Sequence, residues 1–139
     1  MRYGSFKVSL FPGQAEWGMK SKKSLRKLAW KLQSEYIRRS SKGICFTCGD
    51  KRNWKFQQAG HYIHKDCLDY DPINIHCQCV RCNKWLSGNS GVYCERLVAE
   101  YGEEAVVDLR TRSMQVRKFT ITELEQIIDG NKMRLAELE

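Results

Sequence analysis

The sequence has no long hydrophobic run. None of its 139 residues lies in a stretch of about eighteen apolar residues, the length that a membrane-spanning helix needs. Its first residues also lack the continuous apolar segment and the small-residue cleavage site of a secretory signal peptide. No internal repeat and no low-complexity segment is present. We therefore expect one domain, with at most a short appended arm, in a reducing cytoplasm and without membrane contact.

Acidic residues are nearly absent from one part of the chain. The net charge is +8, which favours a polyanionic partner such as nucleic acid. Within residues 20–42, nine Lys and Arg residues are accompanied by a single acidic residue, Glu35. This short segment therefore accounts for the whole excess of positive charge.

The basic segment is predicted to be a helix over residues 21–40. Leu25, Leu28, Leu32 and Tyr36 recur at helical spacing and predict one apolar stripe. The remaining faces are basic, which favours contacts with DNA phosphates over a merely solvated surface. The residues expected to contact the DNA backbone are Lys22, Lys23, Arg26, Lys27, Lys31, Arg38 and Arg39.

The seven cysteines are expected to be metal ligands or thiols rather than disulfides in a reducing compartment. Cys45 and Cys48 form one CxxC pair, and Cys79 and Cys82 form a second. Four thiolates in two close pairs are typical of a structural, tetrahedral Zn²⁺ site. Cys77 remains an alternative ligand, because it lies two residues before Cys79 and would share its strand face.

Thirty residues separate the two pairs, which leaves room for a β-hairpin. Strands are predicted over residues 53–63 and 74–78, and helices over 91–101 and 120–138, with another helical turn or two over 103–110. Thr120 with Glu123, or Thr122 with Glu125, predicts a capping box at the start of the last helix. If zinc joins the first pair to a helix that starts at Cys82, the end of the first strand lies near that helix. His61 on the strand could deprotonate water, and the Asn83 amide oxygen could hold a hard divalent cation. These are the groups needed to hydrolyse a phosphodiester.

The motifs CxxC, AGHY (59–62), NIHCQCxxCN (74–83) and LSGN (86–89), in this order, resemble the zinc-stapled branch of the HNH (ββα-metal, treble-clef) nucleases. Phage endonuclease VII proteins share the Asn after the last zinc cysteine. The similarity is closer to the NinG (Rap) recombination protein family of lambdoid phages, and covers about residues 44–102 with family-like helices on both sides. It implies an α+β fold with a small ββα-metal core flanked by helices, and an endonuclease for Holliday junctions and related branched DNA.

The resemblance also implies roles for individual residues. His61 corresponds to the general base, Asn74 to the residue that braces the hairpin loop, and Asn83 to a ligand of a catalytic Mg²⁺ or Mn²⁺. HNH nucleases usually carry an acidic metal ligand just before the base, where this chain has Gly60. His76 is the favoured replacement, because it shares a strand face with Asn74. The other candidates for this second ligand are His64, Asp66, Asp69 and Asp71.

We therefore divide the chain into an N-terminal arm (1–19), a basic helix (20–42), a zinc-stapled HNH-like core (43–102) and a C-terminal helical segment (103–139). The expected partners are branched DNA, a second copy of the chain that would match the two-fold symmetry of a Holliday junction, and phage or host recombination proteins. The family implies a bacterial host's cytoplasm. Two rival interpretations are a non-catalytic, zinc-dependent DNA-binding module and a protein-interaction zinc domain.

Overall fold

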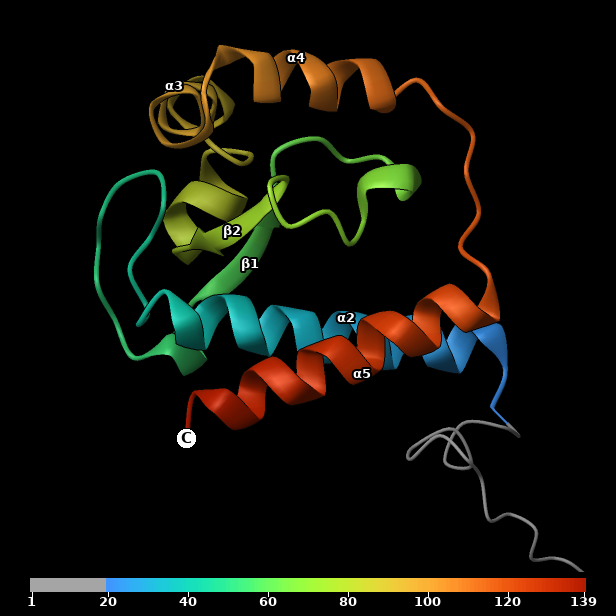
Figure 1. The fold of residues 1–139 in the computed structure, drawn as a ribbon. Coiled ribbons are helices and arrows are strands. Elements are labelled where there is room, and N and C mark those ends of the chain that lie inside the picture. Colours follow the sequence, from blue (N-terminus) through green and yellow to red (C-terminus); the bar gives the residue numbers. More distant parts are fainter. Residues whose placement is uncertain (1–19) are drawn as a thin grey trace, which may run out of the picture.

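The computed structural model describes residues 20–139, so the predicted N-terminal arm lies outside the described residues. The described chain combines helices with one two-stranded sheet, which confirms the α+β class. Figure 1 shows the helix pair α2–α5 on one side of the β-hairpin and the helices α3 and α4 on the other. The main elements are α2 (Lys22–Ser40), β1 (Gln58–His61), β2 (Ile75–Gln78), the helical turn η3 (Arg81–Trp85), α3 (Ser90–Tyr101), α4 (Glu103–Arg112) and α5 (Ile121–Glu137).

Helix α2 confirms the predicted basic helix. It begins after Ser21, whose hydroxyl accepts a hydrogen bond from the Ser24 backbone N–H at 3.1 Å, as expected of an N-cap. Its buried residues are Leu25, Ala29 and Gln33, whereas Leu28 and Leu32 are only partly buried. The apolar stripe is therefore rotated from the predicted one, because the small side chain of Ala29 belongs to the face that contacts α5.

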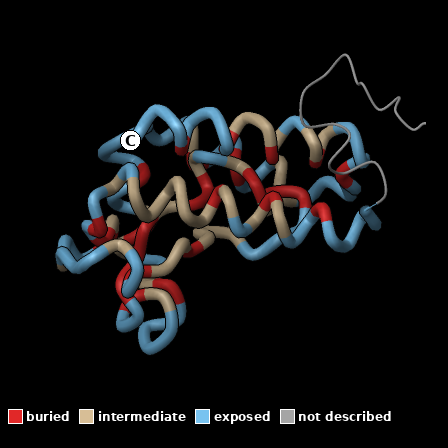
Figure 2. The backbone as a smooth tube through the Cα atoms, turned by 90° about the horizontal axis from the view of Figure 1, so that it is seen from below, coloured by how far each residue is buried: buried red, intermediate tan, exposed pale blue. Residues whose placement is uncertain are grey.

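Helix α5 lies beside α2 and runs in the same direction (Figure 1). Its N-terminus has the predicted capping box, in which Thr120 and Glu123 each bond the other's backbone N–H. Leu124 and Ile128 pack against the buried face of α2. Figure 2 shows buried positions on the inward sides of these helices and exposed positions outside. The apolar face of α5 is thus used within the chain.

The hairpin is shorter than predicted. The strand expected over residues 53–63 is reduced to Gln58–His61, because Trp54–Phe56 forms a 3₁₀ turn whose Lys55 N–H bonds to the Asn53 side chain at 3.0 Å. The strands are antiparallel, with Gly60 opposite His76 and His61 opposite Ile75. The register decides which side chains share a face of the sheet.

The loop between the strands is held by Asn74, which is fully buried. Its side-chain oxygen accepts from the Ile63 N–H at 2.9 Å, and its amide donates to the carbonyls of Ile63 at 2.9 Å and Leu68 at 3.2 Å. This geometry matches the bracing role that the family resemblance implies for Asn74.

Helices α3 and α4 close the other side of the hairpin. Tyr93, Leu97, Val106 and Leu109 pack with Leu68 into a second core. Residues 103–112 thus form a ten-residue helix, longer than the predicted turn or two. No helix within residues 20–139 is both long enough and apolar enough to cross a bilayer.

Candidate metal centres and nucleic-acid interface

The four predicted zinc ligands meet at one point. The sulfur atoms of Cys45, Cys48, Cys79 and Cys82 all lie within 4.8 Å of one another, and those of Cys48 and Cys79 are 3.7 Å apart. Zn–S bonds of about 2.3 Å place the sulfurs of a tetrahedral site about 3.8 Å apart. The donor set therefore fits a structural Zn²⁺. Cys77, the alternative ligand that the sequence left open, is not part of this cluster and is therefore excluded as a zinc ligand.

The protonation of the cluster also favours a cation. Burial opposes ionisation of the Cys45 thiol, yet hydrogen bonds from Thr47 and from backbone amides lower its pKa to about 6. Burial and the neighbouring sulfurs raise the pKa of Cys48 to about 12. Crowded thiols resist becoming several thiolates at once unless a positive ion compensates their charge. A dication would provide that compensation.

The LSGN motif supports the cluster through its backbone. Ser87, Gly88 and Asn89 all have positive φ angles, of 51°, 94° and 50°, so the chain turns sharply after η3. The turn directs the Asn89 amide to the Cys82 sulfur at 3.6 Å and the Gly88 N–H to the Cys82 carbonyl at 2.8 Å. The motif therefore has a structural role next to the metal cluster.

Asn83 lies against Gly60, the position at which the usual carboxylate is missing. The Asn83 amide donates to the Gln58 side-chain oxygen at 2.7 Å. Its own oxygen would be only 2.7 Å from a Cβ atom at position 60. A larger residue at Gly60 would therefore displace the Asn83 side chain.

A buried glutamine, Gln78, completes this corner. It is fully buried, and its Nε2 donates to the Gly88 carbonyl at 2.9 Å and to Thr47 at 3.2 Å. Its Oε1 has no hydrogen-bond partner and also faces the Cβ position of Gly60. Sequence reasoning missed Gln78, although a polar residue in a strand of buried residues is a usable signal.

His61 is the last residue of β1 and points away from this corner, because neighbouring residues alternate between the faces of a strand. Its ring stacks on Trp30 of α2, with centroids 4.8 Å apart. Its Nε2 lies 3.0 Å from the Asp69 carbonyl. A carbonyl only accepts, so Nε2 carries the proton and Nδ1 of the neutral ring is an acceptor. His61 and Asn83 thus occupy opposite faces at the end of one strand.

His64 lies on the His61 side. Because β1 ends at His61, the strand alternation no longer separates the two residues, and their ring centroids are 5.9 Å apart. Asp69, another candidate ligand, is paired with Arg26 at 3.2 Å. Asp71 is paired with Arg112 at 2.8 Å and also accepts from loop backbone N–H groups. The exposed Asp66 lies in the loop between the strands.

His76, the favoured second ligand, is instead held by aromatic side chains. Its ring stacks on Phe46 at a centroid distance of 4.0 Å. Its Nε2 lies 2.9 Å from the Tyr101 hydroxyl and its Nδ1 lies 3.4 Å from the Tyr93 hydroxyl. Both nitrogens are therefore engaged, and the structure does not pair His76 with Asn83.

Burial lowers the pKa of His76 to about 4, which predicts a pH-dependent stability. An unfolded histidine has a pKa near 6.5, so the unfolded state binds more protons between about pH 4 and pH 6.5. We expect this contribution to the unfolding free energy to be intact above pH 6.5 and to fall by on the order of 2–3 kcal/mol towards pH 4. Chemical unfolding of wild type and His76→Phe across this range measures it as a difference.

Protonation of the zinc ligands affects both of these proteins equally, so the difference reports on His76. His64→Ala, which removes an exposed histidine, is the control. Parallel stability profiles for wild type and His76→Phe would contradict the buried neutral state.

The predicted DNA-contacting residues divide into two groups. Lys22, Lys23, Lys27 and Lys31 are exposed on the first half of α2. The others have partners within the chain: Arg26 pairs with Asp69, Arg39 pairs with Glu35 at 3.0 Å, and Arg38 and Arg39 lie over the Trp54 ring at 5.1 and 5.7 Å. The four exposed lysines are thus more accessible to an external anion than the paired arginines.

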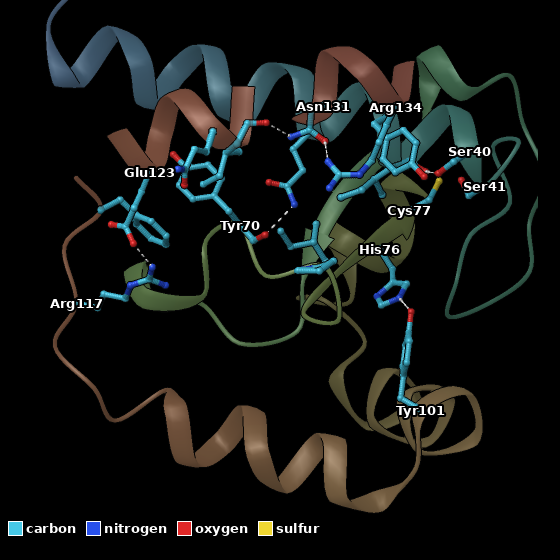
Figure 3. A pocket seen from close by; sticks show the side chains of 18 residues that line it. Ser40, Ser41, Tyr70, His76, Cys77, Tyr101, Arg117, Glu123, Asn131 and Arg134 are labelled. Carbon is cyan, nitrogen blue, oxygen red and sulfur yellow. Dashed lines mark hydrogen bonds and ion pairs between the residues drawn. The ribbon is translucent and has the colours of Figure 1, made fainter. Parts of the chain in front are cut away.

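Two cavities lie near these elements. The larger, of about 740 Å³, is lined by α2, α5, β2 and the segment before α5, with the His76–Tyr101 hydrogen bond at one end (Figure 3). The smaller, of about 410 Å³, lies beside the cysteine cluster between Phe56 and Trp85. These aromatic side chains are 71% and 78% exposed and have Arg52 and Arg81 beside them.

Comparison with known proteins gives one consistent result. The sequence model described as "Bacteriophage Lambda NinG protein" matches residues 14–139. "Protein ninG" of Escherichia phage 933W is 31% identical over 134 residues, covering 86% of this chain and 66% of that protein. "Protein ninG" of Escherichia phage lambda and that of Salmonella phage P22 are each 30% identical over 132 residues, covering 84% of this chain and 64% of theirs. The chain thus spans about two thirds of these relatives, and no solved structure matches it.

Proposed function

The chain belongs to the family of the bacteriophage lambda NinG protein, and we propose that it is a divalent-metal-dependent endonuclease for branched DNA in phage recombination. The observation that carries this proposal is the arrangement of His61 and Asn83 at the end of β1. His61 there has a fixed ring with an acceptor nitrogen, and Asn83 packs against the residue just before it. The proposed general base is thus the residue after Gly60, and the proposed oxygen ligand contacts Gly60 from the opposite face of the strand.

His61 has the properties of a general base. The Asp69 carbonyl orients the ring through Nε2, and stacking on Trp30 restricts its rotation. Nδ1 is then the atom that would take a proton from the attacking water. Asp69 contributes its backbone carbonyl to this arrangement, while its carboxylate pairs with Arg26.

Asn83 fits the expected ligand of the divalent ion, because amide oxygens suit hard cations such as Mg²⁺ and Mn²⁺. Such an ion, when bound, would neutralise charge on the scissile phosphate. The hydrogen bond from the Asn83 amide to Gln58 keeps the Asn83 oxygen directed at Gly60. The structural Zn²⁺ would hold η3, and with it Asn83, against the hairpin.

The surface of α2 supports binding to a DNA backbone. Lys23, Lys27 and Lys31 are four residues apart, so they form one exposed row on the helix. Contacts of this kind recognise phosphates rather than bases, which suits a substrate recognised by shape. The exposed Phe56 and Trp85 could stack on unpaired bases at a branch point. A dimer on a two-fold symmetric junction, in the cytoplasm of a bacterial host, completes the proposal.

Replacing the three lysines of this row by glutamine is expected to weaken junction binding and its salt dependence. The plot of log K against log salt concentration has a negative slope, and each lost phosphate contact reduces the magnitude of this slope by about 0.9. The slope of the triple variant should therefore be smaller in magnitude by up to about 3. Fluorescence anisotropy at several salt concentrations measures this slope. The control replaces the exposed Lys51, Lys118 and Lys132, which removes the same charge elsewhere. Equal slopes for the two triple variants would contradict a role specific to α2.

The second candidate is a zinc-dependent DNA-binding module without catalysis. Gly60 favours it, because the position of the usual acidic ligand has no side chain and no room for one. This candidate shares the basic helix and the zinc cluster with the first, so DNA binding does not distinguish them.

Cleavage of a labelled four-way junction tests the proposal. Zinc-loaded protein is incubated with the junction or with a matched linear duplex, with and without added Mg²⁺ or Mn²⁺. Omitting the added ion is preferable to EDTA, which would also remove zinc. We expect cuts near the branch only when the ion is present. Tight, salt-sensitive binding without cleavage under any of these conditions would reject the nuclease and favour the binding module.

A further inference from the structure

We propose that Gln78 supplies the second protein oxygen of the divalent-cation site at Asn83, in place of the carboxylate that position 60 lacks. This inference rests on the proposed function, because it extends the same site. It assigns a metal-binding role to a residue that sequence reasoning did not select.

The first observation is an unsatisfied oxygen. Three buried glutamines, Gln33, Gln57 and Gln78, each have a buried side-chain oxygen without a hydrogen-bond partner among the described residues. A buried carbonyl that gives up water without gaining a donor is costly. For Gln78 the structure shows a second side-chain oxygen in the same place, because Oδ1 of Asn83 also faces the Cβ position of Gly60. Two oxygens that face the same position repel each other, and a cation bound between them would stabilise this arrangement.

An acceptor-only partner fixes the orientation of the Gln78 amide, and the Gln58 side chain pairs with the amide of Asn83. Gln78 Nε2 lies 2.9 Å from the Gly88 carbonyl, which only accepts, so the nitrogen must be on that side and Oε1 on the other. Thr47 also accepts from this nitrogen at 3.2 Å. Asn83 Nδ2 donates to Gln58 at 2.7 Å, which leaves its oxygen facing Gly60. Both oxygens are thus directed at one site.

The glycine is what makes this arrangement possible. A Cβ at position 60 would overlap Gln78 Oε1 and would approach Asn83 Oδ1 to 2.7 Å. The space that a side chain at position 60 would fill therefore belongs to the Gln78 oxygen. Gly60 and Gln78 act together as a substitute for a single acidic residue.

The chemistry of this pair limits which ions it binds. Two neutral amide oxygens are hard ligands that suit Mg²⁺ or Mn²⁺. They bring no negative charge, so the ion would be held weakly by the protein alone. The phosphate of bound DNA would provide the missing charge. We therefore expect metal affinity to rise at least ten-fold when DNA is bound.

The zinc cluster holds Gln78 in place. Thr47 lies between two zinc ligands in the sequence, and its hydroxyl contacts the Cys45 sulfur at 3.3 Å and accepts from Gln78. The Gly88 carbonyl, the other acceptor, belongs to the turn that supports Cys82. The structural metal would thus position the ligands of the second one.

Manganese titration tests the assignment without measuring activity. Zinc-loaded, ¹⁵N-labelled protein is titrated with Mn²⁺, and the side-chain amide signals of its glutamines and asparagines are followed by NMR. Bound Mn²⁺ broadens nearby signals first, so Gln78 and Asn83 should broaden before Gln33 and Gln57. The latter two are matched controls, because their oxygens are also buried and unpartnered. Broadening of Asn83 without Gln78, or of neither, would overturn the assignment.

Variants give a second measurement. Mn²⁺ affinity, followed by electron paramagnetic resonance, should fall at least ten-fold in Gln78→Leu and in Asn83→Leu but not in Gln57→Leu. If Gln78→Leu does not fold, the wild-type titration decides alone. An Asn83 amide turned so that it donates to Gln78 would remove the oxygen pair, and the titration would then leave both signals sharp.

The same preparations separate this inference from the proposed nuclease. Early broadening of Gln78 and Asn83 without junction cleavage would support the metal site and reject the nuclease. Metal-dependent cleavage with a sharp Gln78 signal would support the nuclease and reject Gln78 as a ligand.

Discussion

A Cys82→Ser variant is expected to lose its zinc and the folded core between residues 43 and 102. Cys82 is fully buried, and its backbone and sulfur also hold the Ser87–Asn89 turn. Structural zinc contributes about 10–16 kcal/mol in zinc-finger peptides, as much as the roughly 5–15 kcal/mol of a whole small domain. Losing one ligand should therefore unfold this region. Zinc content by mass spectrometry and thermal unfolding by circular dichroism measure the two effects.

The control for this prediction is Cys94→Ser. Cys94 lies on α3 outside the cysteine cluster, with its sulfur 3.6 Å from Arg110. The Cys94→Ser variant should bind one equivalent of zinc and unfold close to the wild-type temperature. Some helical signal should survive in Cys82→Ser, because α2 and α5 share a core of their own. A Cys82→Ser protein that kept its zinc and its melting temperature would contradict the role of the cluster.

A His61→Ala variant is expected to cut junctions about 10²–10⁴ times more slowly while binding them as tightly as the wild type. This range is the usual contribution of a general base. Binding should persist because the phosphate contacts that we propose are made by the exposed lysines of α2, not by His61. Single-turnover cleavage and anisotropy on the same junction measure the two quantities separately.

Two further variants separate chemistry from structure at His61. His61→Gln keeps a donor near the position of Nε2 for the Asp69 carbonyl but lacks a basic ring nitrogen, so it should be as slow as His61→Ala and more stable. His64→Ala removes the neighbouring exposed ring and should cut at nearly the wild-type rate. Equal loss of binding and cleavage in His61→Gln would indicate a structural histidine instead.

The sequence by itself predicted the features that depend on residues close together in the chain. Helix α2 and the capping box of α5 follow from apolar spacing and from an N-cap residue with its partner three residues later. A turn of a few residues brings the two sulfurs of each CxxC pair together, and in the structure all four sulfurs lie within 4.8 Å of one another. The motif order also indicated the NinG family, to which the chain belongs.

Predictions that depended on pairing and packing were less accurate. The first strand is limited to four residues because only Gln58–His61 pairs with β2. The buried face of α2 consists of Leu25, Ala29 and Gln33, so Leu28 and Leu32 of the predicted stripe are only partly buried where α5 packs. His76 shares the predicted face, yet Phe46, Tyr93 and Tyr101 surround it, from segments distant in sequence.

The candidate metal ligands show the same division. Asn83 was predicted from the sequence because its place directly after Cys82 is a local signal. Gln78 was not predicted, because the position of its side-chain oxygen depends on contacts distant in sequence. Gly60 leaves the space for this oxygen, and the acceptors Thr47 and Gly88 fix the orientation of the amide. Local spacing determined the helices and each CxxC pair, since these need only neighbouring residues, and the order of the motifs along the chain indicated the family. Only the tertiary structure decided which oxygens face one another, because strand register and buried hydrogen bonds set those directions.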